Sequence, residues 1–312
     1  MKKYGFGVDV GGTTVKIGFF ETSGNLLDKW EIKTNTENNG ASILSDIAQA
    51  IDNKLAQEQI SKDDVQGIGI GVPGPVSSDG IVHRCVNLGW GIVNVAEDLG
   101  KLTGLKVRVG NDANVAALGE MWKGGAEGCK DVIVVTLGTG VGGGIIVDGK
   151  IVAGANGAGG EIGHITVNEA EIEACNCGQY GCLEQYASAT GIVRMAKRKL
   201  AKTTDTTTLT SVEELTAKAI FDEAKNGDAI AIQLVEELGR ILGSALSNMA
   251  CVVNPEIIVI GGGVSKAGSI LIDTIQKHYV ETSFLACRDA KFALAQLGND
   301  AGMYGCMQMI LD

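Results

Sequence analysis

The feature that most constrains the fold is a strand, a glycine and threonine turn and a second strand, a pattern that the chain carries twice. The first copy is "YGFGVDVGG" followed by "TVKIGFF", and the second is "DVIVVTLGTGVGGGIIV". Gly11 and Gly138 occupy matching places, an offset of 127 residues (138 minus 11). A duplicated core is the expected explanation, although two unrelated hairpins remain an alternative because the match is short.

The rest of the chain alternates between strand and helix patterns, which indicates an α/β fold. Strands are expected at 4–12, 14–20, 25–34, 65–76, 105–112, 256–263 and 291–298, and helices at 41–59, 188–200, 211–227, 229–253 and 300–311, with a helix from about 112. Residues 201–210 are expected to form an exposed loop. At 312 residues the chain is long enough for two domains.

Charge and composition exclude several classes of protein. The formal net charge is -11, which opposes binding to nucleic acid or to an anionic membrane. Asp9 interrupts the apolar amino-terminal stretch, so a secretory signal is not expected and the protein is predicted to be cytoplasmic. In a reducing compartment the isolated Cys85, Cys129, Cys251, Cys287 and Cys306 are expected to be core or inert thiols.

One histidine and three cysteines are crowded into a short glycine-containing segment. Cys175, Cys177 and Cys182 follow His164 by 11, 13 and 18 residues. A set of three thiolates and one imidazole predicts a closed tetrahedral zinc site, and four protein ligands would make the metal structural. An accidental Cys-x-Cys pair beside a hydrogen-bonded histidine is the alternative.

Two glutamates flank this segment. Glu161 precedes His164 by three residues, and Glu184 follows Cys182 by two. A metal-bound loop would fix both carboxylates as acceptors for hydroxyl groups, and the second imidazole nitrogen would be available for a hydrogen bond. A polyol is therefore the expected ligand, whereas solvated surface acids are the alternative.

Three glycine-rich turns follow strands and predict a nucleotide site. In "DVGGTTVKIG" the backbone amides of the turn and the Thr13 hydroxyl can face phosphate oxygens, Lys16 adds positive charge, and Asp9 can hold a water of Mg²⁺. "LGTGVGGG", with Thr139 as donor, and "VIGGGVSKAG" repeat the device. Hairpins also use such turns without any ligand, and no P-loop or dinucleotide motif is present.

The stretch "GNDANVAAL" places Asn111 and Asp112 where a strand passes into a helix. Asp112 is interpreted either as the cap of that helix or as a general base that takes the proton of a substrate hydroxyl during phosphoryl transfer.

As a set, "DVGGTTVKIG", "GND", "LGTGVGGG", "EIGH", "CNCGQYGCLE", "QYASATG" and "IGGG" resemble the ROK family of sugar kinases and repressors, within it the bacterial glucokinases, over essentially the whole chain. The resemblance implies a two-lobed, actin-like α/β ATPase fold with ribonuclease-H-like sheets and a structural zinc loop. The lobes would be residues 1–112 with 301–312, and residues 113–300.

The resemblance also implies roles for individual residues. Asp112 would be the catalytic base. The sugar would be bound by Asn87, Asn111, Asp112, Glu161, His164 and Glu184. The zinc ligands would be His164, Cys175, Cys177 and Cys182. The ATP phosphates would lie against Asp9, Gly11, Gly12, Thr13, Lys16, Gly138, Thr139 and Gly140, and the adenosine against Gly261, Gly262 and Gly263.

The implied activity is transfer of the ATP γ-phosphoryl group to the 6-hydroxyl of glucose, with Mg²⁺ accompanying ATP. A kinase for N-acetylmannosamine, N-acetylglucosamine or fructose is the alternative within enzymes, and polyphosphate is an alternative donor. A sugar-sensing repressor is a further alternative, disfavoured because only eight residues precede Asp9. A homodimer or homotetramer is expected.

Overall fold

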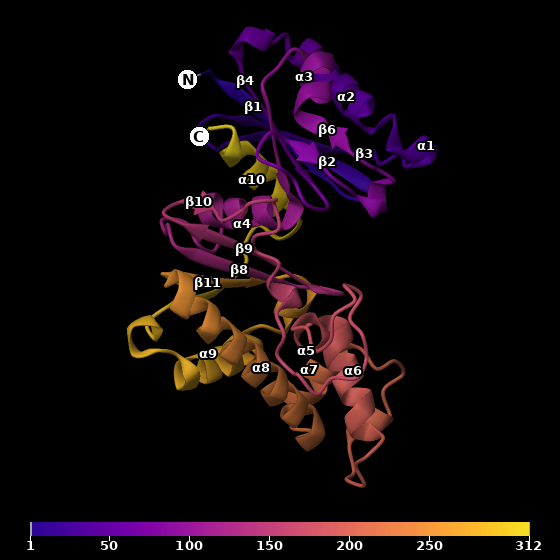
Figure 1. The fold of residues 1–312 in the computed structure, drawn as a ribbon, viewed down its shortest axis with the longest axis vertical. Helices are drawn as coiled ribbons and strands as arrows, with labels where there is room; N and C mark the ends of the chain where they lie inside the picture. The colour runs from indigo at the N-terminus through magenta and orange to yellow at the C-terminus, as the bar shows by residue number, and fades with distance from the viewer. Residues whose placement is uncertain (1, 312) are drawn as a thin grey trace. The chain divides into compact units, whose positions relative to one another are not determined.

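A computed structural model describes residues 2–311, and the chain forms two compact units (Figure 1). Unit 1 comprises residues 1–128, 151–160 and 297–312, and unit 2 comprises residues 129–150 and 161–296. These bounds differ from the expected lobe boundaries at 112 and 300, because the helix that begins at Asp112 packs within unit 1. No helix within residues 2–311 has both the length and the apolar character that a membrane crossing requires.

Unit 1 is built on a mixed five-stranded sheet in the order β3-β2-β1-β4-β7. Its strands are β1 (Tyr4–Val10), β2 (Thr14–Glu21), β3 (Leu26–Lys33), β4 (Val65–Val72) and β7 (Val107–Asn111), and β5 (Ile81–Val82) pairs with β6 (Val93–Asn94). Its helices are α1 (Glu37–Gly40), α2 (Ile43–Glu58), α3 (Val95–Thr103), α4 (Asp112–Lys123) and α10 (Ala301–Met309). The first three strands are antiparallel neighbours, whereas β1, β4 and β7 run parallel.

Helices cover both faces of this sheet (Figure 1). On one face, apolar side chains of α2 and α3 such as Ile47 and Leu99 pack against those of β1 and β4 in a buried core. On the other face, α10 packs against the strands and against α4. Gly7 and Gly69 let the α10 backbone come close, since a Cβ on either would lie 2.0 or 1.8 Å from an α10 carbonyl oxygen. Part of the chain's glycine content therefore serves helix packing.

Unit 2 contains a second mixed five-stranded sheet, in the order β10-β9-β8-β11-β12. Its strands are β8 (Val132–Leu137), β9 (Val141–Val147), β10 (Lys150–Ile151), β11 (Ile257–Gly261) and β12 (Lys291–Leu294). Its helices are α5 (Glu184–Ala187), α6 (Ala189–Leu200), α7 (Ala217–Lys225), α8 (Ala229–Val253) and α9 (Ser269–Thr282). Side chains of β8 and β11 form one core with those of α6, α7, α8 and α9.

The two sheets have the same order of strand directions: an antiparallel meander of three strands followed by two parallel strands. The duplicated strand and turn pattern is therefore present at the level of whole sheets. One other expectation was wrong in detail. The segment 201–210 is not simply an exposed loop, because Leu209 is buried in the core of unit 2. Of the five isolated cysteines expected to be core or inert thiols, Cys251 is exposed and so is not a core residue.

Candidate functional site

In unit 1 two polar side chains lie at the carboxyl ends of parallel strands. Asp9 is close to the end of β1, and Asn111 is the last residue of β7. In the sheet register Asp9 is opposite Gly71 of β4, and Asn111 is opposite Val72. The two residues therefore lie at one edge, where α/β sheets bind their ligands.

The Asp9 carboxyl group has an unusual environment. Its pKa is raised to about 6, chiefly by burial and to a smaller extent by the Asp112 carboxylate, while the Lys16 ammonium acts in the opposite direction. Lys16 is directly opposite Asp9 on β2, and its Nζ donates a hydrogen bond to the Asn299 carbonyl oxygen at 3.1 Å. A buried acid that senses a second acid is typical of a cation or catalytic site.

The hydrogen bonds at the start of α4 show that Asp112 is not the cap of that helix. Asn111, rather than Asp112, is the N-cap, because its Oδ1 accepts hydrogen bonds from the amides of Ala113 and Asn114. The Asn111 amide group also donates to the Gly74 carbonyl oxygen and to Asp112 Oδ1. Asp112 Oδ1 accepts from the Ala113 amide as well, so the carboxylate is held at the first turn of the helix.

The turn between β1 and β2 is anchored at its ends and exposed in the middle. The Gly11 amide donates to the Thr14 carbonyl oxygen, and the Thr34 hydroxyl donates to the Gly11 carbonyl oxygen. Gly12 and Thr13 between them are exposed. Asn87, also exposed, lies next to this turn, since a Cβ on Gly12 would be 3.8 Å from the Asn87 Cβ.

In unit 2 the histidine and the three clustered cysteines come together as the spacing predicts. Their ligand atoms all lie within 4.8 Å of one another. Cys177 Sγ is 3.6 Å from Cys182 Sγ, and Cys175 Sγ is 3.9 Å from His164 Nδ1. Zn–S bonds of about 2.3 Å in a tetrahedron separate the sulfur atoms by about 3.8 Å. The cluster therefore has the dimensions of a zinc site.

Glu184, at the start of α5, is directly connected to this cluster. Its Oε1 accepts a hydrogen bond from Cys175 Sγ at 2.9 Å and lies 3.9 Å from His164 Nδ1. Burial raises the pKa of Cys175 to about 12, and the bond to Glu184 acts in the same direction. Glu161 precedes the short 3₁₀ helix that ends at His164, and it is exposed.

Two glycine turns lie side by side at the carboxyl edge of the unit 2 sheet, because β8 and β11 are parallel neighbours. Gly262 has φ of +82°, and a Cβ there would lie 2.5 Å from the Leu137 carbonyl oxygen. The turn at 138–140 reaches Glu184, since a Cβ on Gly140 would lie 2.6 Å from Glu184 Oε2. Backbone at this edge can therefore approach a ligand closely.

A pocket of about 350 Å³ opens beside the second of these turns. It is lined by Ala189, Thr216, Ala217, Lys218, Phe221, Asp222, Lys225, Gly263, Val264, Lys266 and Ala267. A lining that combines apolar side chains with a few polar ones is typical of a small-molecule site. Sequence analysis did not find Phe221, which belongs to α7 and is remote from any glycine motif.

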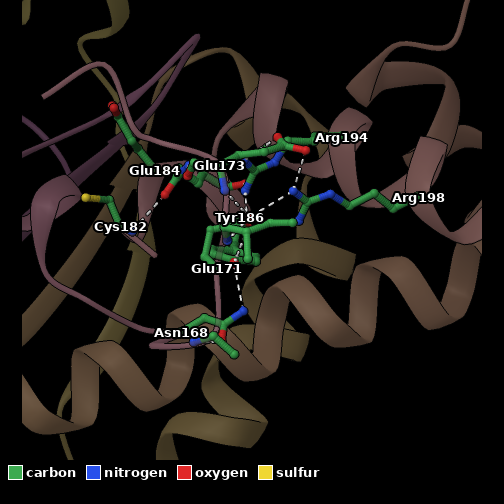
Figure 2. Close-up of polar contacts among 12 residues, drawn as sticks. Asn168, Glu171, Glu173, Cys182, Glu184, Tyr186, Arg194 and Arg198 are labelled. Carbon is green, nitrogen blue, oxygen red and sulfur yellow. Dashed lines mark hydrogen bonds and ion pairs between the residues drawn. The ribbon is translucent and has the colours of Figure 1, made fainter. Parts of the chain in front are cut away.

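Sequence analysis also did not identify an ion-pair network in unit 2. Glu171 lies between Arg194, Arg198 and the Tyr186 hydroxyl (Figure 2). The two arginines are four residues apart on α6, a spacing that places them on one face of the helix. That spacing was the available signal, but nothing in the sequence indicates which acid they bind.

Comparison with known proteins agrees with this architecture. The model of the ROK family matches residues 5–312. A glucokinase of Halalkalibacterium halodurans is 47% identical over 96% of this chain and 92% of that protein, and a glucokinase of Thermotoga maritima is 36% identical over 97% and 96%. A crystal structure of a ROK family glucokinase from Streptomyces griseus in complex with glucose and AMPPNP has a TM-score of 0.73 and 34% identity, covering 98% of each chain. The chain belongs to the ROK family.

Proposed function

We propose that this protein is a glucokinase that transfers the γ-phosphoryl group of ATP to the 6-hydroxyl of glucose, with an actin-like ATPase fold. The observation that carries the proposal is the pair of interacting carboxyl groups, Asp9 and Asp112, at the carboxyl edge of the unit 1 sheet. The similarity to glucokinases supports glucose as the acceptor.

Asp112 is the proposed catalytic base. Its carboxylate takes the proton of the 6-hydroxyl while the 6-oxygen bonds to the γ-phosphorus and the bond from that phosphorus to ADP breaks. Asn111 supports this role because it supplies the helix cap, and its amide group donates to Asp112 Oδ1 at 3.0 Å, which orients the carboxylate. Most of the acceleration would come from positioning, since the transition state of phosphoryl transfer is loose.

Asp9 is proposed to hold a water of the Mg²⁺ ion that accompanies ATP. A buried carboxyl group next to a second one fits such an ion, which binds proteins through one or two carboxylates and keeps several waters. Bound Mg²⁺ would supply charge neutralisation for the phosphates. Lys16, Gly11, Gly12 and Thr13 are proposed to contact the phosphates from unit 1.

Unit 2 is proposed to contribute further phosphate contacts through Gly138, Thr139 and Gly140, and to bind adenosine at Gly261, Gly262 and Gly263. The pocket beside Gly263 supports the second assignment, because its apolar walls suit a purine ring. Sugar hydroxyls are proposed to donate hydrogen bonds to the carboxylates of Glu161 and Glu184. The His164 ring is proposed to donate or accept one further hydrogen bond. In unit 1 the proposed sugar contacts are Asn87, Asn111 and Asp112.

A structural zinc ion is proposed at His164, Cys175, Cys177 and Cys182. The donor set and the 4.8 Å limit on all ligand separations fit tetrahedral zinc. When bound, zinc would cross-link the two ends of the loop, and it requires Cys175 as the thiolate, so the hydrogen of the Cys175 thiol would no longer occupy Glu184. The Glu184 carboxylate would then be available to a hydroxyl group.

The decisive experiment is a coupled assay of ADP release with glucose, N-acetylmannosamine, N-acetylglucosamine and fructose, using ATP or polyphosphate. We expect the highest kcat/KM with glucose and ATP. A higher kcat/KM for an N-acetylated sugar would replace glucose by that sugar, and no turnover with any sugar would favour a sensing role.

The eight free cysteines support the proposed cytoplasmic location. A homodimer or homotetramer remains the proposed assembly.

A further inference from the structure

The loop that carries the cysteine cluster is held by a second set of contacts centred on Glu171. Only 1% of the Glu171 side chain is exposed. Glu171 belongs to the loop, and its carboxylate faces Tyr186 of α5 and two arginines of α6 (Figure 2). A carboxylate so deeply buried is costly unless each oxygen is satisfied.

Both oxygens of Glu171 are fully used. Arg198 binds the carboxylate with two parallel hydrogen bonds, Nη1 to Oε2 at 2.8 Å and Nη2 to Oε1 at 2.9 Å. Oε2 also accepts from Arg194 Nη2 at 3.1 Å and from the Tyr186 hydroxyl at 2.6 Å. Oε1 also accepts from the amides of Ile172 and Glu173, both at 3.0 Å.

The charges in this network favour the ionised acid. Arg198 first, and then the remaining hydrogen bonds, hold the pKa of Glu171 far below its usual range despite burial. Glu173 adds a second acid on the outer side, 2.8 Å from Arg198 Nη2. Two-point arginine contacts fix orientation as well as distance. The geometry is thus that of a rigid connection between the loop and α6.

This connection extends directly to Glu184, because it holds the two residues that follow Glu184. Tyr186 binds Glu171 through its hydroxyl, and the carbonyl oxygen of Gln185 accepts from Arg194 Nη2 at 2.8 Å. The Gln185 side chain bridges the loop, donating to the Glu173 carbonyl oxygen at 2.9 Å and accepting from the Cys182 amide at 3.0 Å.

None of these contacts involves a cysteine sulfur atom or an atom of the His164 ring. The loop therefore has a support that does not depend on a metal. This matters for the sugar site, because hydrogen bonds to hydroxyl groups require an acceptor that is held within a fraction of an ångström.

We propose that Glu171, Arg194 and Arg198 form a metal-independent clamp that positions Glu184 for the sugar. These are positioning residues, not catalytic ones, and the proposal rests on the proposed kinase function. Loss of the clamp lets α5 shift relative to the sugar and weakens sugar binding, while the ATP contacts and the zinc ligands keep their places.

The test compares Arg198→Met and Glu171→Gln with the wild type in the full-length enzyme. We expect the KM for glucose to rise about tenfold, which corresponds to ~1.4 kcal/mol, with kcat and the KM for ATP within twofold and the zinc content unchanged. Arg198→Lys should give an intermediate KM, since an ammonium group cannot make the parallel pair of bonds. Lys197→Met removes an exposed cation from the same helix and should leave every parameter unchanged.

Hydrogen exchange tests metal independence. In the chelated wild-type enzyme the segment 168–176 should remain protected, and in chelated Arg198→Met it should exchange rapidly. A glucose KM within twofold of the wild type in all three clamp variants would overturn the proposal. So would a fall in kcat accompanied by equal rises in the KM for glucose and the KM for ATP. Loss of protection at 168–176 when the wild-type enzyme is chelated would also overturn it. If Arg198→Met does not fold, the lysine and glutamine variants decide.

Failure of the proposed function would be distinct from failure of the clamp. If the wild type prefers another hexose, the same variants are measured with that hexose, and the clamp predicts the same rise in KM.

Discussion

Gly305 of α10 lies directly against Val115 of α4, so closely that a Cβ on the glycine would be 1.6 Å from the Val115 carbonyl oxygen. The obstacle is helix backbone, which cannot rotate away as a side chain can. The contact fixes how the C-terminal helix packs beside α4, the helix that begins with Asp112.

We therefore expect Gly305→Ala to destabilise unit 1 by about 3 kcal/mol or more, at or above the upper end of overpacking effects. Urea denaturation with the wild type alongside measures this. Gly91→Ala is the matched control, because a Cβ there meets nothing within 4 Å. Equal stability of the two variants would show that α10 moves aside easily.

The raised pKa of Asp9 makes the stability of the folded protein depend on pH. In the unfolded chain the acid ionises near the ordinary aspartate pKa of 3.8, but in the fold its pKa is about 6. Between these values the folded state binds more protons, so the stability of the wild type falls as pH rises from about 4 to 6. Asp9→Asn removes this effect.

Without Mg²⁺, Asp9→Asn should therefore be more stable than the wild type above pH 6, by about 1–3 kcal/mol, and no more stable at pH 4. Thermal unfolding at both pH values tests the sign. The variant should also lose most of its ATP-dependent activity, so that stability and function change in opposite directions. A stability gain that is the same at both pH values would contradict the assigned pKa.

The sequence could predict those parts of the fold that depend on local patterns. Strands β1 and β2 with the turn between them, and the long α8, were predicted because apolar periodicity and glycine turns are local signals. The meeting of His164 with three cysteines was also predictable, since all four residues lie on one loop.

Other features depend on contacts between distant segments. Helix α3 was not predicted, although Asn94 caps it through the Glu97 amide and Gly104 ends it, because it is only nine residues long and lies between short, weakly patterned strands. The proposed helix at 211–227 begins only at Ala217, where Thr216 supplies the cap. The role of glycine in the approach of α10 was invisible in the sequence, since the partner backbone lies at the opposite end of the chain.

The cysteine cluster predicts one zinc ion per chain. Cys177→Ser should reduce zinc content several-fold and raise the KM for glucose, because loop ligation and Glu184 are adjacent. Metal analysis together with glucose kinetics measures both effects. Cys251→Ser alters an exposed thiol outside the cluster and should change neither. Full zinc content in Cys177→Ser would exclude Cys177 as a ligand.

Asp112→Asn tests the proposed base with little change in shape. The amide cannot take a proton, so kcat should fall by about 10²–10⁴-fold. Because Asn111 is the N-cap of α4, the substitution leaves the cap in place and the melting temperature should change little. Glucose binding, measured by calorimetry, should remain detectable. Asp98→Asn, at an exposed position on α3, controls for loss of charge. Near-normal turnover in Asp112→Asn would assign proton removal to another group, and Asp9, whose pKa is raised in part by the Asp112 carboxylate, would be the next candidate in unit 1.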